Sequence, residues 1–212
     1  MKNSIDVFLK GNRNYIQGSQ IIARLSDLLP EANEYFLFSA SFKKITDNCL
    51  YYLYANDDFN KENIAIGSVI FKSYKSENSI KYLIFECLNK RAPLIQDDIK
   101  DYNHNFLLKE ALTSNINLTV KNDFESVVEC IVFFLKKLHS EHKKNVENIW
   151  FSEINNGNIP IFKKKNYIQA DLFINNIFNK KINNKFLTLS KVFFKSLELN
   201  FTCNVTFAYD LL

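Results

Sequence analysis

Glycine is scarce in this chain of 212 residues, which contains only Gly11, Gly18, Gly67 and Gly157. A phosphate-cradling loop needs clustered glycines for tight turns and for close approach of the backbone, and the sequence has no such cluster. This scarcity argues against nucleotide-binding enzymes of the Rossmann and P-loop kinds.

Cysteine is equally sparse, and its four examples, Cys49, Cys87, Cys130 and Cys203, are far apart. They form no Cys-x-x-Cys pair, so the spacing predicts neither a zinc site nor a dense disulfide framework. Each lies in an apolar stretch, where a free cysteine usually packs as a small core residue. We therefore expect a reducing environment, no metal and no cofactor.

Long hydrophobic runs and a large excess of charge are also missing. The N-terminus lacks the apolar core of a signal peptide, and the apolar run at residues 131–135 is far too short to span a bilayer. The net charge is only +4, from 27 basic and 23 acidic residues, which does not favour a nucleic-acid partner. Because 47% of the residues are apolar, the chain can form a substantial core. We expect a cytoplasmic protein with no nucleic-acid or membrane partner.

A short motif occurs twice. The sequence Asn-Tyr-Ile-Gln at residues 14–17 recurs at residues 166–169, and similarities continue downstream at the same offset. An internal repeat predicts a duplicated structural unit. We expect a first repeat at residues 1–96, a connecting segment at 97–123, and a second repeat at 124–212 that is incomplete or rearranged.

Hydrophobic spacing predicts one helix and four strands in the first repeat. Apolar residues recur at helical intervals from Gln17 until Pro30 ends the pattern. Polar turns then separate four strand-like segments, which predicts a meander. These segments are residues 35–45, 49–55, 64–74 and 80–88.

The second repeat is less regular. Residues 124–144 have the strongest helical pattern of the chain, with apolar residues along one face. Strands are expected at residues 149–154 and 159–162, one on each side of an Asn-Asn-Gly turn at residues 155–157. By analogy with the first repeat, we expect a helix at residues 167–178 and strands at 186–194 and 200–209.

Residues 9–25 carry a more specific pattern, in which Gly18 precedes a helix that begins with the aliphatic pair Ile21-Ile22. In the hydroxyacyl-acyl carrier protein dehydratases, a His-Phe-Pro-Gly-x-Pro-x-Met-Pro-Gly segment precedes an aliphatic helix that carries a Glu. The present sequence resembles that arrangement, and residues 40–45 are similar to the Arg-Phe-Arg-Lys-Pro strand of that family. The resemblance implies an α+β double hot-dog fold, in which two antiparallel sheets each wrap a central helix.

The resemblance also implies a protein that processes acyl thioesters of coenzyme A or acyl carrier protein, in fatty-acid or specialised biosynthesis. Dehydration requires a base for the α proton and an acid for the leaving hydroxyl. However, Leu9 takes the position of the catalytic His, and Ala23 takes that of the helix Glu. Dehydration, thioester hydrolysis and acyl transfer therefore all stay open.

Several residues near the first helix are candidates for substrate binding. Backbone N–H groups at Gly18 and Ser19 could polarise a thioester carbonyl, although Gly18 could equally serve a tight turn. Tyr15 and Phe42 would line an acyl tunnel, with a core role as the alternative for Tyr15. Gln17 would either cap the helix or bind substrate.

Charged and titratable candidates complete the predicted site. Arg13 and Arg24 would receive the phosphate of a pantetheine arm, and Ser19 and Gln20 are expected to be exposed at the helix start. His104 could act as a base beside a carboxylate. His139 and His142 are explained by the dipole at the end of their helix and need no metal.

Two other functions stay open. One is a non-catalytic, degenerate hot-dog protein that binds an acyl group or supports a partner enzyme. The other is an interaction protein unrelated to thioesters. A homodimer and a complex with a partner enzyme are both open as assemblies.

Overall fold

The computed structural model describes residues 3–10, 15–55, 64–95, 104–109, 113–142, 146–182 and 185–211. These residues form two α-helices, α1 (Gly18–Ser26) and α2 (Phe124–His142), and a short 3₁₀ helix at Ala32–Glu34. The strands of the N-terminal half are β1 (Asn3–Ile5), β2 (Leu9–Lys10), β3 (Tyr35–Phe42), β4 (Asn48–Tyr54), β5 (Gly67–Ser73), β6 (Ser79–Arg91) and β7 (Leu94–Ile95). Those of the C-terminal half are β8 (His104–Lys109), β9 (Thr113–Asp123), β10 (Val146–Asn155), β11 (Ile159–Pro160), β12 (Lys163–Ile182), β13 (Lys185–Ser196) and β14 (Asn200–Leu211).

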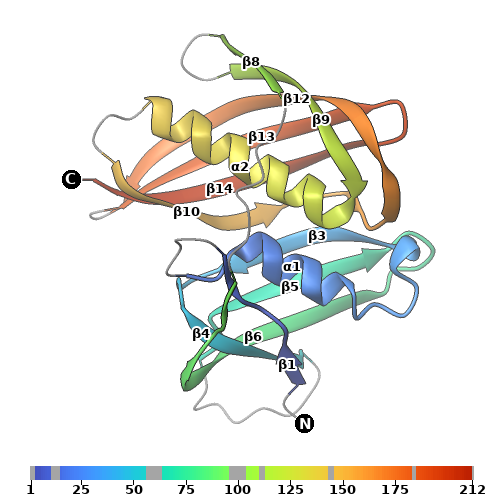
Figure 1. Ribbon diagram of the computed structural model, residues 1–212, viewed down its shortest axis with the longest axis vertical. Helices are drawn as coiled ribbons and strands as arrows, with labels where there is room; N and C mark the ends of the chain where they lie inside the picture. The colour runs from blue at the N-terminus through green and yellow to red at the C-terminus, as the bar shows by residue number, and fades with distance from the viewer. Residues whose placement is uncertain are drawn as a thin grey trace.

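Twelve of the described strands form one antiparallel sheet, in the order β1-β4-β6-β5-β3-β10-β14-β13-β12-β9-β8, with β11 paired to β3. The remaining two, β2 and β7, pair with each other in parallel. In Figure 1, α1 lies on the N-terminal part of the sheet and α2 on the C-terminal part. The two parts join where β10 pairs with β3 through Ile154 and Ala40.

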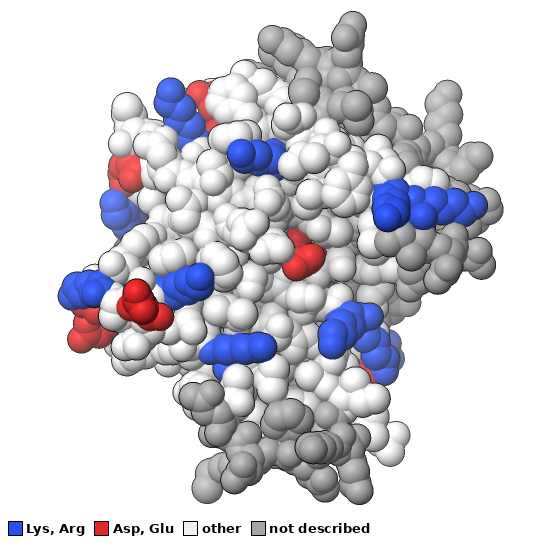
Figure 2. Space-filling model, turned by 180° about the vertical axis from the view of Figure 1, so that it is seen from behind, with Lys and Arg blue, Asp and Glu red and all other residues white. Residues whose placement is uncertain are grey.

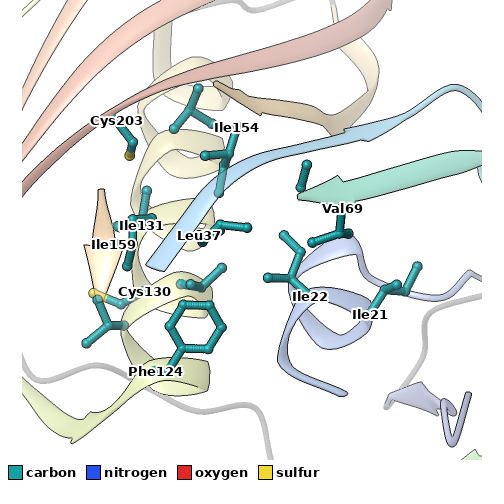
Figure 3. Packing of buried hydrophobic residues seen from close by; sticks show 14 of the residues in the cluster. Ile21, Ile22, Leu37, Val69, Phe124, Cys130, Ile131, Ile154, Ile159 and Cys203 are labelled. Atoms are coloured by element: carbon teal, nitrogen blue, oxygen red, sulfur yellow. The ribbon is translucent and has the colours of Figure 1, made fainter. Parts of the chain in front are cut away.

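A single large hydrophobic core lies between the sheet and the two helices. In β9, Ile116, Leu118 and Val120 are buried while the residues between them are exposed, as expected for a strand with one covered face. Figure 3 shows Ile22 of α1 and Ile131 of α2 among residues of β3, β5, β10 and β14. Both helices therefore contribute to one core. No helix in the described ranges is long and apolar enough to cross a membrane.

Several predicted elements are confirmed. The helix expected after Gln17 is α1, and the one expected at residues 124–144 is α2. The four expected strands of the first repeat correspond to β3, β4, β5 and β6, but they do not form a meander, because β5 and β6 are inserted between β3 and β4. The expected turn contains Asn156, which has a φ of 49°.

The helix expected at residues 167–178 is wrong, because these residues belong to β12. Their buried residues are Ile168, Ala170, Leu172 and Ile174. This alternation has the period of a strand, whereas the outward-facing Phe173 and Phe178 obscure the pattern. The repeated Tyr-Ile-Gln motif therefore precedes a helix once and lies in a strand once.

Residues 113–123 were expected to belong to a connecting loop, but they form β9, an inner strand of the C-terminal half. α2 is followed by β10, β11, β12, β13 and β14. The division into two hot-dog repeats stays a prediction.

Candidate functional site

A salt bridge joins the two halves of the molecule beside α2. The Nζ atom of Lys10, in β2, lies 2.9 Å from Oε1 of Glu129 and 3.9 Å from Oε1 of Glu125, both in α2. The side chains of Lys10 and Glu129 are only 13% and 10% exposed. Removing two such charges from water is costly unless they satisfy each other. The pair therefore places an ammonium and a carboxylate in contact at a largely buried position.

The dehydratase resemblance placed its catalytic His at Leu9 and its helix Glu at Ala23, so neither Lys10 nor Glu129 is at a predicted position. Glu129 is the sixth residue of α2, as Ala23 is the sixth residue of α1. Lys10 directly follows Leu9, which takes the place of the family's His and is buried in β2. The N-terminal half thus lacks both expected groups, but the contact between the halves contains a carboxylate and an ammonium at or beside equivalent positions.

Sequence reasoning missed this pair because it aligned the halves by the Tyr-Ile-Gln motif. That alignment placed the second helix at residues 167–178 rather than at α2. Only the helix starts seen in the structure, Gly18 and Phe124, match Ala23 with Glu129.

Tyr15 contacts the same helix two turns further on. Lys136 Nζ donates a hydrogen bond to Tyr15 Oη at 3.3 Å and lies 6.0 Å from the centre of the Tyr15 ring. Because Lys136 is seven residues after Glu129, both side chains lie on one face of α2. Lys10 and Tyr15 therefore contact a single face of α2 from the N-terminal half.

The start of α1 is packed tightly against two aromatic rings. A Cβ atom added to Gly18 would lie 2.7 Å from Cδ1 of Phe151 and 2.8 Å from Cε2 of Phe42. These rings, from β10 and β3, have centroids 5.7 Å apart. Glycine is thus required here for close approach of the helix to the junction of the two halves.

Two expectations about the first turn of α1 are wrong. Ser19 and Gln20 are buried rather than exposed, because the first turn of α1 lies in the interior. Gln17 makes no side-chain cap hydrogen bond, so the capping role expected for it does not occur. Gln20 Oε1 instead accepts a hydrogen bond from the backbone N–H of Phe8 at 3.2 Å, and Gln20 Nε2 is buried without a partner.

The predicted phosphate-binding arginines are only partly described. Arg13 lies outside the described residues. Arg24 Nη1 is 3.7 Å from Oδ2 of Asp27, and its guanidinium lies 5.8 Å from the centre of the Phe8 ring. Asp27 also pairs with Lys163 of β12. Its carboxylate therefore contacts one basic residue from each half.

The backbone of His104 belongs to β8, where it pairs with Leu118; its side chain lies outside the described residues. β8 is the last strand at one end of the sheet, and β9, β12, β13 and β14 separate it from β10. His104 therefore lies at the edge of the sheet, far from β3 and β10, which carry Phe42 and Phe151. Its role as a base stays a prediction.

The remaining nucleophile and ligand candidates are structural. His139 is buried and its Nε2 lies 3.1 Å from Oγ1 of Thr188 in β13. Cys130 and Cys203 are buried, and burial raises the pKa of the Cys203 thiol to about 12, which suppresses the reactive thiolate. Among the described residues, no group of three or more His, Cys, Asp or Glu side chains could hold a metal ion.

No protein-family model matches the chain, and no curated protein has a similar sequence. Solved structures do match. The tesB protein of Mycobacterium avium subsp. paratuberculosis is 11% identical with a TM-score of 0.55, over 96% of this chain and 90% of that one. A conserved protein of unknown function with a hot-dog fold, from Alicyclobacillus acidocaldarius, is 9% identical with a TM-score of 0.52, over 100% of this chain and 91% of that one. At these identities the similarity establishes the fold alone: the chain has the hot-dog fold.

Proposed function

We propose that this hot-dog protein binds and processes acyl thioesters of coenzyme A or acyl carrier protein at the contact between its two halves. Each half, with its own helix, would be one hot-dog unit. The observation that carries the proposal is the largely buried Lys10–Glu129 pair, which joins β2 to α2 at 2.9 Å. Acid–base groups placed at a contact between apolar units are typical of a ligand site.

The pair offers the chemistry that such reactions need. In dehydration of a β-hydroxyacyl thioester, the Glu129 carboxylate would take the α proton. The Lys10 ammonium would protonate the departing hydroxyl, which leaves as water. In thioester hydrolysis, Glu129 would instead take a proton from the attacking water, and the released thiolate would be protonated.

The start of α1 would stabilise negative charge on the thioester oxygen. Gly18 and Ser19 are the first two residues of a helix whose N-cap, Gln17, provides no side-chain acceptor. Backbone N–H groups in the first turn have no partner within the helix, and they point toward developing negative charge. Tyr15 and Phe42 would border the acyl group, and Arg13 and Arg24 would receive the pantetheine phosphate. His104 is a further base candidate.

The experiment is a mass-spectrometric turnover screen with β-hydroxyacyl and saturated acyl thioesters of coenzyme A and acyl carrier protein. Loss of one water identifies dehydration, and release of free thiol identifies hydrolysis. The Glu129→Gln variant should lower turnover by about 100-fold or more, the usual effect of losing a general base. The Glu125→Gln variant is the matched control, because Glu125 is one turn away and 3.9 Å from Lys10.

Loss of one partner from a buried pair can destabilise a protein by about 3–5 kcal/mol. Thermal unfolding of each variant is therefore measured beside turnover. The double variant Lys10→Met/Glu129→Met removes both charges and should fold while staying inactive. Equal turnover in the Glu129→Gln, Glu125→Gln and unmodified proteins would show that the pair is structural.

A second candidate function is a non-catalytic hot-dog protein that binds an acyl group or supports a partner enzyme. It is favoured by the apolar, buried Leu9 and Ala23, which replace the catalytic pair in the N-terminal half. Binding of an acyl thioester without consumption, measured by calorimetry and mass spectrometry together, would support it. Under this function the Arg24→Ala variant weakens binding of acyl-coenzyme A and leaves the fold intact.

A further inference from the structure

The outer face of the sheet, away from the helices, differs between the two halves. In the N-terminal half, Tyr51 and Phe85 are paired across β4 and β6 on this face, stack at 5.2 Å, and are both buried. In the C-terminal half, the cross-strand pair Phe173–Phe193 of β12 and β13 is 39% and 38% exposed. The C-terminal half thus leaves an aromatic pair partly uncovered on the face where the N-terminal half buries one.

A depression of about 610 Å³ lies at this aromatic pair, within the usual size range of small-molecule pockets. Its position follows from the end of β10. Beyond Asn155, β10 no longer pairs with β14, and the loop residue Asn158 takes its place by accepting a hydrogen bond from Thr202 N at 2.8 Å. The lining consists of Asn158, Phe173, Phe193, Phe194, Lys195, Asn200, Phe201 and Thr202.

Two lysines and one neighbouring acidic residue lie around the depression. Lys195 is the charged residue of the lining, and it has no salt-bridge partner among the described residues. Its cross-strand neighbour is Asp171, whose Oδ1 instead accepts a hydrogen bond from Asn117 Nδ2 at 2.9 Å. Lys191 adds a second ammonium, which lies 5.0 Å from the centre of the Phe193 ring.

We propose that this depression is a binding site for a medium- or long-chain carboxylate, with the chain against Phe173 and Phe193 and the carboxylate at Lys195. Aromatic walls favour an apolar chain, because its contact removes apolar surface from water. The unpaired ammonium, together with the amides of Asn158 and Asn200, provides donors that a carboxylate accepts. Figure 2, which views the molecule from the side opposite to Figure 1, shows mainly uncharged atoms on this face, with one acidic residue near its centre and charged residues of both signs toward its edges. This site is separate from the Lys10–Glu129 pair and does not depend on the proposed catalysis.

The test is titration of the full chain with dodecanoate and with dodecanol, below the aggregation limit of each, followed by two-dimensional amide NMR. Dodecanoate should shift the amide signals of Phe193, Lys195 and Thr202 and bind more tightly than dodecanol by up to about fivefold, as for a single exposed charge pair. The Lys195→Ala variant should remove that preference. The Lys180→Ala variant, which removes an exposed lysine of β12 outside the lining, should keep it.

A Phe193→Ala variant should weaken binding of both probes by about tenfold or more, since it removes an aromatic contact from the wall. Unfolding curves identify any variant that fails to fold. If Phe193→Ala fails to fold, Phe193→Leu is used in its place. The proposal is overturned if dodecanoate shifts only signals near Lys10 and Tyr15, or if Lys195→Ala keeps the preference. It is also overturned if sedimentation shows that a second copy of the chain covers this face.

Discussion

α1 and α2 occupy similar positions on the two halves of one sheet, but they begin differently. Before α2, Oδ1 of Asp123 accepts a hydrogen bond from Ser126 N at 2.8 Å, which satisfies a backbone donor of the first turn. Before α1, Gln17 provides no such bond, and α1 has only nine residues against nineteen in α2. α2 is thus the more strongly fixed helix, whereas the start of α1 has no side-chain cap.

The strands after each helix also differ in order. Outward from the central junction, the N-terminal half has β3, β5, β6 and β4, whereas the C-terminal half has β10, β14, β13 and β12. The second arrangement needs only hairpins between β12, β13 and β14. The first needs a crossover from β4 to β5, which are parallel and separated by β6, and such crossovers are long. The same layered shape therefore results from two connectivities, and the simpler one accompanies the better-capped helix.

The largest expected effect tests whether α2 is the more rigid helix. Leu135 in α2 and Leu25 in α1 are both fully buried, and a Leu→Ala substitution in a core costs about 2–5 kcal/mol. The cost depends on how far the surroundings can collapse into the cavity. We expect the Leu135→Ala variant to lose more unfolding free energy than Leu25→Ala, measured by urea denaturation. An equal or smaller loss at Leu135 would contradict this difference between the helices.

An intermediate effect tests the close packing at the start of α1. In the Gly18→Ala variant the new Cβ must displace the rings of Phe42 and Phe151, and such overpacking costs about 1–3 kcal/mol. Urea denaturation measures the loss. The double variant Gly18→Ala/Phe151→Leu should recover part of it, because leucine leaves room beside the new methyl group. If the double variant is less stable than Gly18→Ala by the full effect of Phe151→Leu alone, the contact with Phe151 does not limit the approach of α1.

Hydrophobic spacing and polar turns predicted α1, α2 and β3 to β6, although burial does not alternate in β4, where residues 50–53 are all buried. Hydrophobic spacing failed at β12, where the outward-facing Phe173 and Phe178 hid the alternation of Ile168 and Leu172. It also could not predict that β5 and β6 insert between β3 and β4. Strand order depends on contacts between distant segments, and a short sequence motif does not encode it.

The candidate site was predicted only in part. The position of Gly18 at a helix start followed from the sequence, whereas its contact with Phe151 of the other half did not. The Lys10–Glu129 pair joins residues 119 positions apart in the chain. Neither residue has a local pattern that distinguishes it from an ordinary solvated charge, and only the packing of β2 on α2 brings them together.

The smallest effect concerns the helix caps. The Asp123→Ala variant should lose about 1 kcal/mol of unfolding free energy, the typical cost of removing an N-cap side chain. The Gln17→Ala variant should lose almost none, because Gln17 makes no cap bond. Both are measured by urea denaturation at neutral pH. A comparable loss in the two variants would remove the distinction between the two helix starts.

The same comparison extends to pH. Burial alone would raise the pKa of Asp123, but the hydrogen bond from Ser126 and the ammonium of Lys121 outweigh it and hold this pKa below its ordinary value of 3.8. A carboxylate whose pKa is lowered by folding stabilises the folded state fully above its unfolded pKa, and this contribution disappears as the pH falls through the folded pKa.

The difference in unfolding free energy between the unmodified protein and Asp123→Ala is measured by urea denaturation at several pH values. This difference should be constant from pH 7 to about 5 and become smaller below about pH 4. The Gln17→Ala variant, which removes no titrating group, should follow the unmodified protein over the whole range. A gap for Asp123→Ala that stays constant down to pH 2 would mean that the charge of Asp123 contributes nothing to the start of α2.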